Sequence, residues 1–119
     1  MNQCSYISLE KAKTGIPVPI YTNGKPSCSL YNPEREAEVF ANLPEFANTN
    51  YFVIGGCASG LHIQKLREKY PNAIICILED NKSTIDFCKA QIILKNEANY
   101  IYCDIDSLKE TLMNTYFPP

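Results

Sequence analysis

The sequence predicts an α/β protein, with a Rossmann-like partial parallel sheet of three βα units preceded by a small N-terminal β-ribbon and a helix. Three short apolar segments, residues 51–55, 73–78 and 100–103, alternate with longer segments whose apolar residues recur at helical spacing. This alternation indicates βαβ units, in which right-handed crossovers place the strands side by side in sequence order. We expect the ribbon over residues 1–31 and the Rossmann-like domain over residues 32–119.

The ribbon is expected within residues 14–30, which are rich in turn residues and proline. Asn23-Gly24 is typical of a type I′ hairpin turn, because both central residues of that turn need positive φ. The prolines of this segment have no N–H donor, so its strands should be irregular or lie at a sheet edge. We therefore predict a small, loosely paired ribbon with its turn at Asn23-Gly24.

The next segment carries the signals of a helix. Asn32 is a suitable N-cap, and Pro33 suits the first helical position, where an N–H would have no partner. Ala37 and Phe40 fall on one face of such a helix. We predict a helix that begins after Asn32 and is closed by Pro44.

Each predicted strand of the parallel sheet is followed by a predicted helix. Ile63, Leu66 and Tyr70 form one apolar stripe on the first of these helices. Asn81 and Asp106 have side chains that cap the N-termini of the other two. The strand and helix pairs are 51–55 with 59–70, 73–78 with 81–94, and 100–103 with 106–116. Because three strands are about half of a doubly wound sheet, we expect the chain to be the front part of a longer protein.

The composition argues against several functional classes. The formal net charge is -2 and the Lys and Arg residues do not cluster, so we expect no nucleic-acid or membrane partner. The start of the chain lacks the layout of a signal peptide, and no stretch could span a bilayer, so we expect a cytoplasmic protein. The 6 cysteines include no CxxC pair, and the sequence has 1 histidine. This pattern predicts reduced, buried thiols and no metal site.

A glycine-rich loop, GGCASG at residues 55–60, joins the first parallel strand to the following helix. Small residues allow a tight turn and a close approach of a ligand to the backbone, and the helix N-terminus presents free N–H groups. The candidate ligand-binding residues in and after the loop are Gly55, Gly56, Ser59, Gly60 and His62. The alternative is a structural turn between a strand and a closely packed helix.

Acidic residues follow the next two strands. Glu79 lies about 20 residues after the loop, where Rossmann-like folds place an acid that accepts hydrogen bonds from ribose hydroxyls. Asp80 lies beside it, and Asp104 ends the third strand, where methyltransferase-like folds place a contact to adenine. Together they predict a nucleotide or nucleotide-sugar ligand, with no other cofactor indicated. The alternative is that these acids cap the helices that follow them.

No catalytic residue is predicted. His62 has no nearby acid or nucleophile in the sequence, and Ser59 has no base partner, so neither belongs to a catalytic set. We therefore do not expect catalysis by these 119 residues alone, and any enzymatic activity would belong to a parent protein.

Three pieces of the sequence carry a resemblance to a known family: residues 29–37 (SLYNPEREA), 56–62 (GCASGLH) and 77–81 (ILEDN). In order and content they resemble the amino-terminal domain of the motility accessory factor family. The proteins of this family are bacterial flagellin glycosyltransferases. The likeness runs from about Gly15 to Asp104. The chain has Ala58 where the family has a glycine, and Leu61 where the family often has an aromatic residue.

The resemblance implies a non-catalytic domain that supports a later catalytic domain of the same chain or binds the acceptor, flagellin. For the parent protein it implies transfer of a nonulosonic acid from its nucleotide-activated form to Ser or Thr of flagellin. Two other functions stay open. The loop, with Glu79 and Asp104 at successive strand ends, is also typical of an S-adenosylmethionine-dependent methyltransferase. The ribbon and the exposed edges of an incomplete sheet would suit an interaction module or a homodimer.

Overall fold

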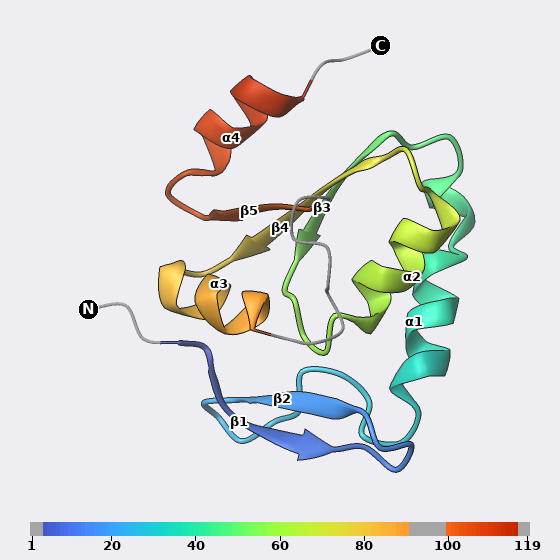
Figure 1. Ribbon diagram of the computed structural model, residues 1–119, viewed down its shortest axis with the longest axis vertical. Helices are drawn as coiled ribbons and strands as arrows, with labels where there is room; N and C mark the ends of the chain where they lie inside the picture. The colour runs from blue at the N-terminus through green and yellow to red at the C-terminus, as the bar shows by residue number, and fades with distance from the viewer. Residues whose placement is uncertain (1–3, 91–99, 117–119) are drawn as a thin grey trace.

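The computed structural model describes residues 4–90 and 100–116 as an α/β fold with two sheets (Figure 1). A parallel sheet has the strand order β3-β4-β5, and an antiparallel two-stranded ribbon, β1-β2, precedes it. The elements are β1 (Tyr6–Lys11), β2 (Pro17–Tyr21), α1 (Pro33–Ala41), the 3-10 turn η1 (Pro44–Phe46), β3 (Tyr51–Gly55), α2 (Leu61–Lys69), β4 (Ile74–Glu79), α3 (Lys82–Lys89), β5 (Tyr100–Asp104) and α4 (Leu108–Thr115). The predicted fold class is therefore confirmed. The predicted end of the second helix, near Leu94, lies outside the described residues.

The core lies between the parallel sheet and α2. Ile75 and Ile77 of the central strand β4 are fully buried, and so are Ile63 and Leu66 of α2, which belong to the same cluster. Burial of one such side chain contributes about 1.5–3 kcal/mol. The predicted apolar stripe is confirmed for these two α2 residues, whereas Tyr70 lies at the helix C-cap and is only half-buried.

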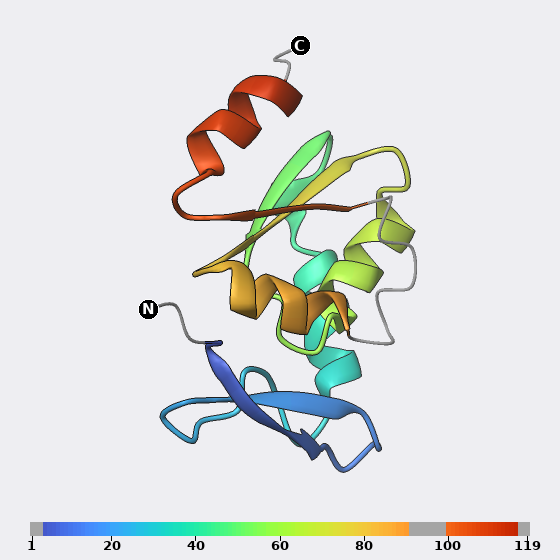
Figure 2. The same cartoon turned by 60° about the vertical axis from the view of Figure 1, so that its left-hand side comes forward.

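The two faces of the sheet are covered unequally. Helices α2 and α3 lie on the face of the sheet that contributes to the core, whereas α4 lies on the opposite face (Figures 1 and 2). The hydroxyls of Tyr51 and Thr115 are 2.7 Å apart, and the rings of Tyr51 and Tyr116 meet edge to face, which joins α4 to β3. Val53 and Ile74 share this face with Tyr51, because alternate strand residues point the same way. They are 44% and 37% exposed, so α4 covers this face only in part.

The ribbon differs from the prediction in its first strand. β2 pairs with β1, which lies inside the region 1–31 predicted for the ribbon but before residues 14–30, where its strands were expected. The chain does turn at Asn23-Gly24, and the Gly24 N–H donates to the Tyr21 carbonyl at 2.9 Å. Of the two residues predicted to have positive φ only Gly24 has it, at 85°, so the turn is not the predicted type I′ turn, and it leads only to one bridge between Ile20 and Pro26. β1 buries only its first residue, so it lacks the alternation that marks a half-buried strand, and backbone pairing defines it instead.

The helix starts agree with the prediction at α1 and differ at α4. The Asn32 side chain accepts a hydrogen bond from the Arg35 N–H at 3.0 Å, as expected of an N-cap. At α4 the cap residue is Ser107 rather than Asp106, because the Asp104 side chain bonds the Ser107 N–H and hydroxyl and shifts the turn by one residue. None of the described helices has the length and apolar character needed to cross a membrane.

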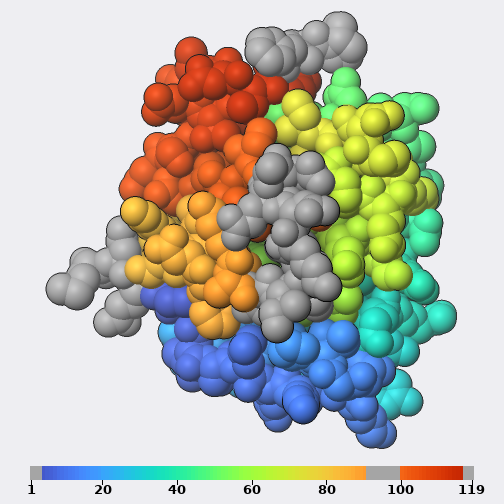
Figure 3. Space-filling view, viewed as in Figure 1, coloured from blue at the N-terminus to red at the C-terminus, as the bar shows by residue number. Residues whose placement is uncertain are grey.

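The ribbon packs against the carboxyl ends of the parallel strands. The Ser5 N–H donates to the Thr84 hydroxyl of α3 at 2.9 Å, and the ring centres of Tyr6 and Phe87 are 5.2 Å apart. Figure 3 shows the ribbon, in blue, directly against α3, in orange. Rossmann-like folds bind their ligands at this edge of the sheet. In this protein, the ribbon therefore occupies part of that region.

Candidate functional site

The glycine-rich loop makes a tight, left-handed path between β3 and α2. Gly56 and Gly60 have φ of 97° and 83°, a conformation that glycine adopts readily and other residues resist. Ala58, between them, has φ of 46°, which costs an L-residue about 1–2 kcal/mol. The geometry of the turn alone therefore explains why residues 56 and 60 are glycines.

Four N–H groups of the loop, those of Gly56, Cys57, Ala58 and Gly60, are bonded inside the chain. The Cys57 N–H donates to Oε2 of Glu79 at 2.9 Å, and the Ala58 N–H donates to the hydroxyl of Tyr6 at 3.2 Å. Two more bond to backbone carbonyls, Gly56 N–H to Leu78 O at 2.9 Å and Gly60 N–H to Cys57 O at 2.8 Å. A phosphate-binding loop must offer such groups to its ligand. Here a phosphate would first have to displace partners within the chain.

Glu79, the predicted ribose contact, is turned into the protein. It is 7% exposed, and its Oε2 also accepts from the hydroxyl of Tyr6 at 3.2 Å and from the thiol of Cys88 at 2.9 Å. Burial, followed by the nearby Glu79 carboxyl, raises the pKa of Tyr6, so its hydroxyl stays protonated. A hydrogen bond with Cys57, followed by burial, raises the pKa of the Cys88 thiol. The donors of this network therefore keep their protons across the neutral range.

A strand-end hollow of about 240 Å³ lies beside this network. Its lining residues come from the loop, the ends of β4 and β5, and the ribbon: Ser5, Tyr21, Gly55, Gly56, Leu78, Glu79, Asp80 and Ile105. Asp80 Oδ2 accepts a hydrogen bond from the Ser5 hydroxyl at 2.8 Å. The described lining includes two carboxyl side chains and no Lys or Arg, so this hollow is poorly suited to an anionic ligand.

Asp104 does not line the strand-end hollow, although its neighbour Ile105 does. It is opposite Glu79 in the parallel register of β4 and β5. Its Oδ1 accepts from the Ser107 N–H at 2.9 Å and from the Ser107 hydroxyl at 2.8 Å, and these bonds lower the pKa of Asp104. The structure therefore gives Asp104 the helix-turn role that was the alternative to adenine binding.

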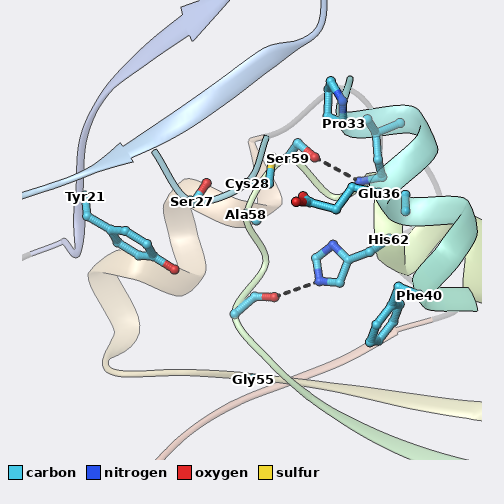
Figure 4. Close-up of a pocket in the computed structure, with 13 residues that line it drawn as sticks. Tyr21, Ser27, Cys28, Pro33, Glu36, Phe40, Gly55, Ala58, Ser59 and His62 are labelled. Carbon is cyan, nitrogen blue, oxygen red and sulfur yellow. Dashed lines mark hydrogen bonds between the residues drawn. The ribbon is translucent and has the colours of Figure 1, made fainter. Parts of the chain in front are cut away.

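A helix-side cavity of about 230 Å³ lies on the other side of the loop, between α1, α2 and the segment before α1 (Figure 4). Ser59 and His62 line it, together with Gly55 and Gly56, which also line the strand-end hollow. His62 Nε2 is 3.1 Å from the Gly56 carbonyl oxygen. Burial lowers the pKa of His62, so the ring is neutral near pH 7. The predicted site residues are thus not gathered in one hollow: Gly55 and Gly56 line both hollows, and Gly60 and Asp104 line neither.

The sequence did not indicate three residues that prove central to this region. Tyr6 was missed because its partners, Ala58 and Glu79, are distant in the chain and only the fold brings them together. Cys28 and Glu36 line the helix-side cavity; Cys28 carries no motif, and Glu36 lies in the segment 29–37 that carries the family resemblance, which assigned it no ligand role. The sequence places Glu36 in the first turn of α1, but it does not indicate that its carboxyl group bonds the Ser29 N–H.

The cysteines are free thiols, and Cys57, Cys76, Cys88 and Cys103 are buried. The Sγ atoms of Cys76 and Cys103, on neighbouring strands, are 3.3 Å apart. Burial, followed by the neighbouring Cys103, raises the pKa of Cys76 to about 12. Within residues 4–90 and 100–116, no group of three His, Cys, Asp or Glu side chains is placed to hold a metal ion.

In comparisons with known proteins, no family model, curated protein or solved structure matches this chain. Its function therefore has to be inferred from its residues and from the geometry of the loop region.

Proposed function

We propose that this chain is a non-catalytic, Rossmann-like domain of a motility accessory factor-type protein glycosyltransferase, where it supports the catalytic domain or binds flagellin. The observation that supports a non-catalytic role is that N–H groups of the glycine-rich loop form hydrogen bonds within the chain. The N–H groups of Cys57 and Ala58 are held by Glu79 and Tyr6, all within the chain. Two groups that would bind a sugar nucleotide are therefore engaged within the chain, and the bond from Ala58 to Tyr6 links the loop to the ribbon.

The charge of the two hollows supports the same proposal. A nucleotide-activated nonulosonic acid carries a phosphate and a carboxylate, and both are anionic. The described lining residues offer Glu36, Glu79 and Asp80 as charged groups, and no Lys or Arg. Like charges at such a site disfavour binding, which fits a domain that leaves the donor sugar to another part of the protein.

The segment on which the family resemblance most depends has a structural role here. The Thr14 hydroxyl donates to Oε1 of Glu34 at 2.6 Å, and the Ser29 N–H donates to Oε1 of Glu36 at 3.0 Å. These bonds tie the ribbon and its connecting segment to α1. The segment 29–37 thus stabilises the junction of ribbon and helix, as a supporting domain requires.

In-frame deletion of the coding region for this chain tests the proposal in cells that produce it. The mass of purified flagellin is measured before deletion, after deletion and after complementation with the wild-type chain. We expect the nonulosonic acid additions to be lost on deletion and restored by complementation. Unchanged flagellin glycosylation after the deletion would contradict the proposal.

A methyltransferase-like domain is the second candidate, and the acidic strand-end hollow favours it. S-adenosylmethionine carries a sulfonium cation, which carboxyl groups at Glu79 and Asp80 would attract. Isothermal titration calorimetry with S-adenosylmethionine at millimolar concentration separates the two candidates. Saturable heat that Asp80→Asn abolishes would favour the methyltransferase, and absence of heat would dismiss it.

A further inference from the structure

The helix-side cavity brings together polar groups from three separate parts of the chain. Figure 4 shows the Glu36 side chain of α1 close to the loop residue Ser59 and the His62 ring of α2 directed at the loop backbone, with Ser27 and Cys28 across from them. The cavity holds about 230 Å³, enough for a small organic molecule. It is separate from the Tyr6–Glu79 network, because neither of those residues lines it.

The histidine presents a hydrogen-bond acceptor. A carbonyl oxygen only accepts, so the 3.1 Å contact to Gly56 O places the ring proton of His62 on Nε2. The neutral ring then leaves Nδ1 as an unprotonated acceptor, and no described residue bonds it. In Figure 4 this second nitrogen lies on the side of Glu36.

Two further acceptors face the same region. One oxygen of Glu36 accepts from the Ser29 N–H at 3.0 Å, and the other has no partner among the described residues. The Ser27 hydroxyl oxygen is buried, and no described group donates a hydrogen bond to it. The cavity therefore offers a carboxyl oxygen and an imidazole nitrogen to a ligand, whereas the Ser27 oxygen is enclosed.

The rest of the lining fixes the kind of ligand that would fit. Pro33, Ala37, Phe40 and Leu61 give the cavity an apolar wall. Among its described lining residues Glu36 is the one charged side chain, so an anion would be repelled and a cation attracted. An ammonium group carries three N–H donors and no acceptor, which matches a lining rich in acceptors.

We propose that the helix-side cavity binds a small primary ammonium compound, with its charged group held by Glu36 and His62 and its carbon chain against Phe40. The site is independent of any sugar or nucleotide chemistry in the rest of the protein. The ammonium donates to the free oxygen of Glu36 and to Nδ1 of His62. Its alkyl part displaces water from the apolar wall.

A matched series of probes tests this by two-dimensional ¹H–¹⁵N NMR of the full chain. n-Butylammonium, 1-butanol and butyrate share a similar chain and differ in the charge of the head group. We expect saturable shifts of the amides of Glu36, Ser59 and His62 with n-butylammonium, weaker shifts with 1-butanol and none with butyrate. Equal shifts with 1-butanol or butyrate, or no shift with n-butylammonium, would overturn the proposal.

Two variants on α1 complete the test. Glu36→Gln keeps an oxygen to accept from the Ser29 N–H but removes the charge, and should weaken n-butylammonium binding about tenfold or more. Glu38→Gln makes the same charge change on the same helix outside the cavity lining, and should leave the affinity unchanged. Equal losses in both variants would show general electrostatic attraction to the surface and no cavity site.

Discussion

The hydroxyl of Tyr6 is predicted to be a main link between the ribbon and the parallel sheet. It donates to Oε2 of Glu79 and accepts from the Ala58 N–H, each at 3.2 Å, and Tyr6 is 4% exposed. Tyr6→Phe keeps the ring in place and removes both bonds. Glu79 retains its hydrogen bonds from Cys57 and Cys88. The main loss is therefore the hydrogen bond from the Ala58 N–H, which stays buried without a partner.

An unsatisfied buried N–H costs about 1–3 kcal/mol, so we expect Tyr6→Phe to lower the free energy of unfolding by about 2 kcal/mol. For a chain of this size that corresponds to a fall in Tm of roughly 8 °C. The chain has no tryptophan, so urea unfolding is followed by far-ultraviolet circular dichroism. Tyr31→Phe, at a side chain that is 70% exposed, is the control and should change stability by less than about 0.5 kcal/mol. If Tyr6→Phe unfolds at the same urea concentration as the wild type, the Tyr6 hydroxyl does not hold the loop.

Three more predictions concern the loop, the core and the histidine. Ala58→Gly relieves the positive φ of 46° and should stabilise the protein by up to about 1 kcal/mol in urea unfolding; a loss of stability would show that the alanine is unstrained. Leu66→Ala should cost about 2–5 kcal/mol because Leu66 is fully buried, whereas Val53→Ala, at a side chain that is 44% exposed, should cost clearly less in the same assay. The pKa of His62 is lowered in the folded state, so the unfolded chain binds the proton first and stability should fall as the pH drops below about 6.5. His62→Gln should flatten this part of the profile of unfolding free energy against pH, and an unchanged profile would contradict the assignment.

The parallel sheet could be predicted from the sequence because its strands are continuous apolar runs. The segments YFVIG, AIICIL and YIYC agree with β3, β4 and β5 to within one residue at each end. Nearly every position of these strands is apolar, on the core face and on the face that α4 covers in part, so the signal does not depend on knowing which face is inside. Ile63 and Leu66 were identified for a related reason, since helical spacing alone assigns them to one face.

The ribbon and the use of the loop could not be predicted in the same way. In β1 the exposed residues Ile7 and Leu9 are apolar, while the neighbouring Ser8 and Glu10 are exposed as well, so polarity carries no information about its pairing. The spacing of Glu79 from the loop fits a ribose contact, but the same spacing brings its carboxyl to the Cys57 N–H. A motif read along the chain cannot show that a distant residue such as Tyr6 occupies the position where a ligand would bind.

We propose that the glycine-rich loop is a structural turn held by the chain itself. The most direct test is a two-dimensional ¹H–¹⁵N NMR titration of the full chain with S-adenosylmethionine, NAD, UDP-glucose and a CMP-linked nonulosonic acid. We predict that the amides of Cys57, Ala58 and Glu79 do not shift with any of these compounds, because their partners lie within the protein. Saturable shifts confined to residues 55–62 and Glu79 with one of them would contradict the claim and identify the loop as a working nucleotide site.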